Sequence, residues 1–110
     1  MKTSELAALL DAKVAQGEYD DGDLAGGYTS DLLSDVMGKA KAAQALVTIQ
    51  AHKNTVAVAT LVGMAAIVVC GSRPVPDDMI EAARAERVAI FVTEMSQFEA
   101  SGRIWDALRR

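Results

Sequence analysis

Cysteine and aromatic residues are scarce in this chain of 110 residues. Cys70 is the only cysteine, which excludes an intramolecular disulfide and any metal or redox site built on a Cys-x-x-Cys pair. Aromatic residues make up only 5% of the chain, although 51% of it is hydrophobic. Small aliphatic side chains must therefore fill the core, which suits helices packed closely on a sheet, and the length is enough for one such domain.

Long apolar runs and clustered basic residues are also missing. The longest apolar run, from Leu61 to Cys70, is interrupted by Gly63 and falls short of the roughly 20 residues that a membrane span needs. The N-terminal segment carries too much charge for a signal peptide. We therefore expect a cytoplasmic protein without a membrane partner. Eleven scattered Lys and Arg residues against 15 acidic ones, a net charge of −4, also argue against nucleic acid as a partner.

The common catalytic and metal-binding motifs are absent as well. The chain has no Walker A lysine motif, GxGxxG, HExxH or GxSxG. An EF-hand counted from Asp21 would need a glutamate at its twelfth position, where Leu32 stands. The acidic run at 18–23 is therefore interpreted as a solvated turn, and the sequence predicts neither a metal nor a cofactor.

The chain instead alternates β-prone and helical segments. The runs AAIVVC and VAIFVT are almost continuously apolar, as is typical of strands buried on both faces of a parallel sheet. The fold class predicted is α/β, a single domain with a mainly parallel sheet of about four to five strands and helices packed on it in βαβ units. Strands are expected near 24–26, 45–50, 65–70 and 88–93, and helices over 4–15, 29–43, 54–63, from about 76 to 87, and over 96–110.

Residues 54–63 are the ambiguous segment, because Val56, Val58, Thr60 and Val62 alternate as in a strand. Three arguments favour a helix. Asn54 is a good helix cap, and the intervening alanines would leave one face of a strand poorly packed. Parallel strands on either side also require a crossover connection. We divide the chain into an N-terminal helix and acidic loop (1–23) and an α/β domain (24–110), together one compact unit.

Residues 28–108 resemble a DRTGG domain. The resemblance rests on SDLLSDVM, TIQAHKNTVAVA, the strand ending in CGSRP, and FVTEMSQFEASGRI. It implies an α/β fold like the N-terminal domain of HPr kinase/phosphorylase, frequent homodimerisation, and a regulatory or accessory role. It does not imply a proven catalytic activity. For short stand-alone members it also implies a link to hydrogenase-type redox enzymes. The motif Asp-Arg-Thr-Gly-Gly itself is absent, so only Gly71 is carried over by position.

Polar residues follow three of the predicted strands, where parallel sheets bind ligands. Backbone amides, hydroxyls and an arginine in one crevice would suit a small anion such as a nucleotide. The same residue types are also ordinary turn and cap residues, so both interpretations stay open. The ligand-binding candidates are Gln50, His52, Asn54, Gly71, Ser72, Arg73, Thr93 and Ser96, with Lys53 and Glu94 on the same rim.

Four side chains have competing interpretations. His52 could act as a general base, but no nucleophile or orienting partner is identifiable, so loop packing or capping is favoured and no catalytic residue is predicted. Cys70 is read as a small buried hydrophobe, with a reactive thiol as the alternative. Phe98 and Trp105 are assigned to the core in preference to a dimer patch.

The leading hypothesis is a non-enzymatic regulatory module, a homodimer that binds a small anionic ligand such as a nucleotide. The alternative is an interaction subunit of a redox enzyme system of the hydrogenase type, without ligand binding. A third hypothesis is a small phosphoryl or acyl transferase that uses His52.

Overall fold

Five strands form one sheet in the computed structural model, which describes residues 1–110. The strand order is β1-β5-β4-β3-β2; β1 runs antiparallel to β5 and the other neighbours pair in parallel. This confirms the predicted α/β class with a mainly parallel sheet. The strands are β1 (Lys13–Gln16), β2 (Gly26–Thr29), β3 (Gln44–Thr48), β4 (Ala66–Val69) and β5 (Ala89–Val92).

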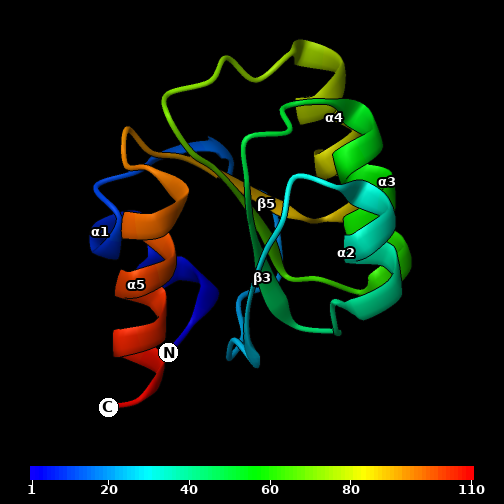
Figure 1. Ribbon diagram of the computed structural model, residues 1–110. Coiled ribbons are helices and arrows are strands. Elements are labelled where there is room, and N and C mark those ends of the chain that lie inside the picture. Colours follow the sequence, from blue (N-terminus) through cyan, green and yellow to red (C-terminus); the bar gives the residue numbers. More distant parts are fainter.

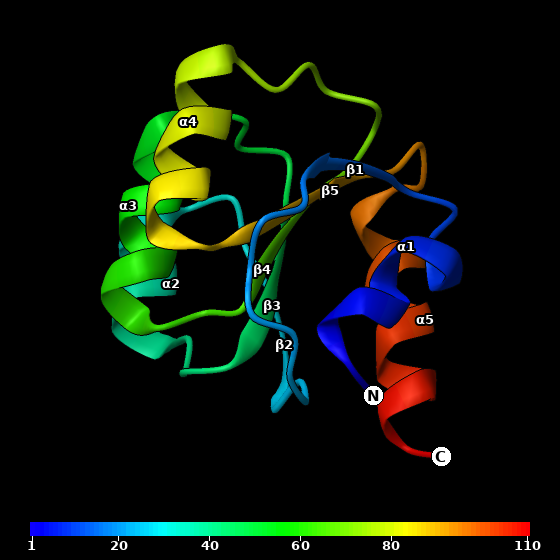
Figure 2. The same ribbon diagram turned by 180° about the vertical axis from the view of Figure 1, so that it is seen from behind.

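Helices cover both faces of the sheet. Figures 1 and 2 show α2, α3 and α4 on one face and α1 and α5 on the other, with both chain ends on the α1–α5 side. None of these helices has the length and apolar character to cross a membrane. The helices are α1 (Leu6–Leu9, after the 3-10 turn Thr3–Glu5), α2 (Leu33–Lys39), α3 (Lys53–Val62), α4 (Asp77–Glu86) and α5 (Gln97–Leu108).

The central strands send alternate side chains into two separate cores. Along β4 and just beyond it, Ala66, Val68 and Cys70 face the α1–α5 layer. Ile67 and Val69 face the layer of α2, α3 and α4. Because side chains alternate along a strand, burial on both faces requires an apolar residue at every position. The continuous apolar runs in the sequence follow from this.

The ambiguous segment is a helix, as predicted. It forms α3, which ends at Gly63 with φ 85°, in the left-handed region that favours glycine. Val56 and Ala59 point into the core. The helix is the crossover between β3 and β4, so the need to connect two parallel strands outweighs the strand propensity of the alternating valines.

The predicted N-terminal helix over 4–15 is wrong beyond its first half. The helix stops at Leu9, Asp11 adopts φ 47°, and the chain then enters β1. Pairing with β5 makes this segment a strand. The side-chain amide of Gln16 also donates to the carbonyl oxygen of Val88 over 3.0 Å. A tertiary contact far along the sequence thus overrides the local helical pattern.

Two other boundaries also differ from the expectation. The strand expected near 24–26 lies at Gly26–Thr29, and the helix expected over 29–43 is confined to Leu33–Lys39. Pairing of Thr29 with Val47 of β3 takes Thr29 out of the expected helix. At the other end, Ala43 has φ 63°, which a continuing helix does not allow.

The core assignment of the two large aromatic side chains on α5 is wrong. Phe98 is 89% exposed and Trp105 is 66% exposed. The helix turns Ala100 and Ile104 toward the sheet instead. Because successive helical residues are about 100° apart, Trp105 lies beside the buried face of the helix and not on it.

We expect Phe91→Ala to lower the free energy of unfolding by about 3–5 kcal/mol, because Phe91 is fully buried and its removal leaves a cavity. Phe98→Ala is the matched control and should change the free energy by less than about 0.5 kcal/mol, since Phe98 is exposed. Urea unfolding followed by far-UV circular dichroism measures both. Equal losses in the two variants would contradict the burial of Phe91 in the core.

Candidate functional site

The loops after β4 and β5 lie together at the carboxyl edge of the sheet. The N–H of Gly71 donates to the carbonyl oxygen of Met95 over 3.0 Å, and the N–H of Ser72 donates to that of Thr93 over 2.9 Å. Gly71 and Ser72 both have positive φ, 69° and 53°. The amides of Gly71 and Ser72 are therefore satisfied within the protein and are not available to a ligand.

Two of the candidate hydroxyls hold other parts of the fold. Thr93 is buried and its Oγ1 donates to the carbonyl oxygen of Leu10 over 2.6 Å, tying β5 to the end of the first helix. Ser96 Oγ accepts from the N–H of Glu99 over 3.2 Å and caps α5. The structure gives both side chains a structural partner.

The loop after β3 caps α3. His52 is the N-cap residue, and its Nδ1 accepts from the N–H of Asn54 over 3.0 Å. The cap is thus His52, whereas the sequence predicted Asn54. Gln50 supports the same turn, because its carbonyl oxygen accepts from Thr55 Oγ1 over 2.8 Å. The bond to His52 satisfies the otherwise free amide of Asn54 at the helix start. No side chain that could serve as a nucleophile hydrogen-bonds to His52.

The most chemically varied cavity lies at the same edge, between β1, the loop after β4 and the start of α4. Its volume is about 500 Å³. The cavity brings together Ser72, Arg73 and Glu94 of the predicted rim but not Gln50, His52, Asn54, Gly71, Thr93 or Ser96. The lining residues are Asp11, Lys13, Val14, Ala15, Ser72, Arg73, Pro74, Val75, Ile80, Val92 and Glu94.

This cavity combines an apolar wall with four charges. Val75, Ile80 and Val92 supply much of the wall. Lys13 and Arg73 line the cavity as cations, and neither forms a salt bridge in the structure. Since neither group forms a close ion pair, each can bind an anion without first breaking one, although the carboxylates of Asp11 and Glu94 line the same cavity.

Asp31 joins the loops at this edge, and the sequence did not predict that role. Its Oδ1 accepts from Thr48 Oγ1 over 3.1 Å and from the N–H of Ile49 over 3.0 Å, and its Oδ2 accepts from Gln97 Nε2 over 3.1 Å. The carboxyl thus connects the ends of β2 and β3 to the start of α5. A polar residue directly after β2 was the available signal, since parallel strands end at one edge.

The pKa of Asp31 reflects this environment. Burial alone would raise it, but the hydrogen bonds from Ile49, Gln97 and Thr48 and the positive charge of Arg73 outweigh burial and lower the pKa below the ordinary value. The carboxylate is therefore charged at neutral pH.

The Cys70 thiol shows the opposite effect. Cys70 is fully buried, and burial together with the negative charge of Asp31 raises its pKa to about 11. The thiol is therefore protonated at neutral pH. This supports its role as a small hydrophobe and argues against the reactive-thiol alternative, because the thiolate is the nucleophile.

Asp11 and Lys13 were also missed by the sequence reasoning. Both lie in the segment predicted to be helical, and they reach the cavity because β1 pairs with the outer edge of β5. No local pattern in a four-residue strand indicates which edge it will join, so nothing in the sequence placed these residues beside Arg73.

No family model matches the sequence, and no curated protein matches it. Among solved structures, the chain is similar to the CBS and DRTGG domains of the regulatory region of Clostridium perfringens pyrophosphatase, a structure complexed with the activator diadenosine tetraphosphate. The TM-score is 0.76 at 13% identity, covering 93% of this chain and 45% of the other. This chain therefore spans less than half of that region, and the similarity confirms the predicted DRTGG-like fold.

We expect Asp31→Asn to lower the free energy of unfolding at pH 7 by about 1–3 kcal/mol. The substitution replaces the carboxylate oxygen that accepts from Gln97 with an N–H donor, and it removes the negative charge. The folded pKa of Asp31 is depressed, so the stabilisation is complete above the unfolded pKa, about 3.9. It is lost as the pH falls through the lower folded pKa. Urea unfolding at neutral and acidic pH should show the two proteins converging at low pH.

Asp23→Asn is the control for this comparison. Asp23 forms an exposed salt bridge with Lys2, and its loss should cost less than about 1 kcal/mol. A pH-independent difference between Asp31→Asn and the wild type would contradict the role given to the Asp31 carboxylate.

We expect His52→Ala to lower the free energy of unfolding by about 1 kcal/mol through loss of the α3 cap. Thermal unfolding measures the effect, and His52→Asn should restore most of the stability because asparagine is a good cap. An alanine variant as stable as the wild type would contradict the capping role of His52.

Proposed function

We propose that this chain is a non-enzymatic regulatory module that acts as a homodimer in the cytoplasm and binds a phosphorylated, nucleotide-type ligand in the cavity at the carboxyl edge. The observation that carries the proposal is the pairing of two unpartnered cations, Lys13 and Arg73, with an apolar wall in one cavity. Together they match a ligand that has a flat apolar part and a negative part.

The phosphate, base and sugar of a nucleotide each match a different set of residues in the cavity. The phosphate of the ligand binds Lys13 and Arg73, because charge-assisted hydrogen bonds to phosphate are strong. The base packs on the wall that includes Val75 and Ile80. The carboxylates of Asp11 and Glu94 are hydrogen-bond acceptors suited to sugar hydroxyls.

Two further observations support a regulatory role over catalysis. A regulatory region with a similar fold is complexed with a nucleotide activator, diadenosine tetraphosphate. The only histidine of this chain caps α3 and has no side-chain hydrogen bond to a nucleophile. The transferase hypothesis therefore lacks the arrangement that nucleophilic catalysis requires.

The second candidate function is an interaction subunit, as the resemblance to hydrogenase-linked proteins implies. Large exposed apolar side chains favour it, including Leu61, Phe98 and Trp105. The two functions differ in their response to small ligands, since only the first requires stabilisation by a nucleotide.

We expect adenine nucleotides and dinucleotides, screened by thermal shift, to include one that stabilises the protein. A ligand at 100 times its Kd adds about 2.7 kcal/mol, which raises the Tm by roughly 10 °C in a domain of this size. Lys13→Ala and Arg73→Ala should each weaken binding about 10-fold or more, because each removes a charged phosphate contact.

Lys41→Ala is the matched control, since it removes the same charge at a position outside the cavity. Isothermal titration calorimetry should show wild-type affinity for this variant. No stabilisation by any nucleotide would overturn the ligand part of the proposal, and equal losses in Lys13→Ala and Lys41→Ala would move the site elsewhere.

A further inference from the structure

We propose that two copies of this chain associate through β2 and the adjoining side of α5, so that their sheets join edge to edge. The proposal rests on the homodimer in the proposed function and is independent of the ligand. The surface, here called the β2–α5 surface, consists of Gly26–Thr29, Phe98, Ser101 and Trp105.

The two edges of the sheet differ in how they are protected. β1 has a bulge between Val14 and Gln16 and carries Lys13, two features that discourage pairing with another strand. β2 has the sequence Gly-Gly-Tyr-Thr, with no charge, proline or bulge, and it pairs with β3 on one side only. Its other side therefore presents unpaired N–H and C=O groups that an extended strand can pair with.

The helix above this edge also lacks a neighbour on one side. On its inner flank α5 meets α1, and Arg103 donates to the carbonyl oxygen of Leu9 over 3.3 Å. On the opposite flank, Ser101 Oγ lies 2.6 Å from Thr29 Oγ1 of β2 in a hydrogen bond. Phe98 and Trp105 lie on this outer flank, because helical residues three and four positions apart share a side.

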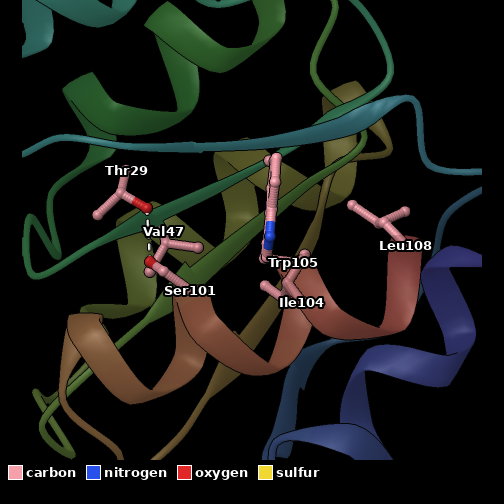
Figure 3. A pocket seen from close by; sticks show the side chains of 7 residues that line it. Thr29, Val47, Ser101, Ile104, Trp105 and Leu108 are labelled. Carbon is pink, nitrogen blue, oxygen red and sulfur yellow. Dashed lines mark hydrogen bonds between the residues drawn. The ribbon is translucent and has the colours of Figure 1, made fainter. Parts of the chain in front are cut away.

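Figure 3 shows Trp105 beside a small cavity next to β2. The cavity has a volume of about 190 Å³, which is enough for part of a partner side chain. It is closed by α5 on one side and by the edge strand on the other. The residues around it are Gly27, Thr29, Val47, Ser101, Ile104, Trp105 and Leu108.

The geometry favours a second copy as the occupant. Antiparallel pairing of β2 with its own copy creates a two-fold axis about 2.4 Å outside the strand, half of the usual strand spacing. A helix lying over β2 and β3, as α5 does, is then about 5 Å from that axis. The two α5 helices would lie about 10 Å apart, close to the spacing of packed helices. One symmetry operation thus satisfies the strand edge and covers the aromatic flank.

The residue order of α5 fits this arrangement. With the two-fold axis beside Thr29, to which Ser101 is hydrogen-bonded, the two α5 helices cross near Ser101. Phe98 of one copy then lies opposite Trp105 of the other, since Ser101 lies about midway between them. The small serine allows close approach at the crossing. The guanidinium carbon of Arg109 lies 5.8 Å from the Trp105 ring centroid, so Arg109 places a positive charge over this ring. None of the residues that define the surface is acidic, and the Asp35 carboxylate next to it accepts from the Tyr28 hydroxyl over 2.7 Å.

The test combines the mass in solution with the fluorescence of Trp105, which is the only tryptophan. We expect light scattering of the wild type to give a dimer, and the emission of Trp105 to shift to shorter wavelength as the concentration rises. Phe98→Glu should weaken association 10-fold or more and abolish the shift. Because Phe98 is 89% exposed, the variant should keep the wild-type circular dichroism spectrum.

Leu61→Glu is the matched control, since Leu61 is 70% exposed on α3, on the other face of the sheet. It should associate like the wild type. A dimer with unchanged Trp105 emission, or a Phe98→Glu dimer as tight as the wild type, would overturn the β2–α5 surface and leave the homodimer standing. A monomer at every concentration would overturn both the β2–α5 dimer contact and the homodimer. The β2–α5 surface would then be a candidate contact for a different protein. The calorimetric titration of nucleotides tests ligand binding separately.

Discussion

Burial of the central strands on both faces is the constraint from which the rest of the structure follows. β3, β4 and β5 carry apolar side chains on both sides, so helices must cover both faces of the sheet. Parallel pairing then requires a crossover helix between successive strands. This requirement makes the segment that becomes α3 helical despite its alternating valines.

The same constraint places most polar side chains at the rim of the sheet. The sheet faces are filled by helices, so polar side chains gather in the loops at the carboxyl ends of the strands. Most of these loop residues hold the loops in place: His52 and Ser96 cap helices, Thr93 ties β5 to the end of the first helix, and Asp31 joins three elements. The side chains left for a ligand are those that no internal contact uses, with Lys13 and Arg73 foremost among them.

The edges of the sheet are the other places where the constraint leaves groups unsatisfied. At one edge, β1 closes the sheet with a bulge and contributes Lys13 to the cavity. At the other edge, β2 remains open beside the exposed Phe98 and Trp105. A chain with few aromatic residues thus places two of them on its surface, which a core-forming role does not explain.

The sequence by itself determined the α/β class, the parallel strands and the helix at 54–63. Burial on both faces requires continuous apolar runs, and parallel pairing requires a helix between the strands, so both are visible in the order of residues. Only the tertiary structure decided that Val14 lies in an edge strand, that Lys13 and Arg73 line one cavity, and that Asp31 connects three elements. These features depend on pairs of residues far apart along the chain, such as Lys13 and Val92. Local propensity carries no information about such pairs, so β1 and the charges it brings could not be placed before the fold was known.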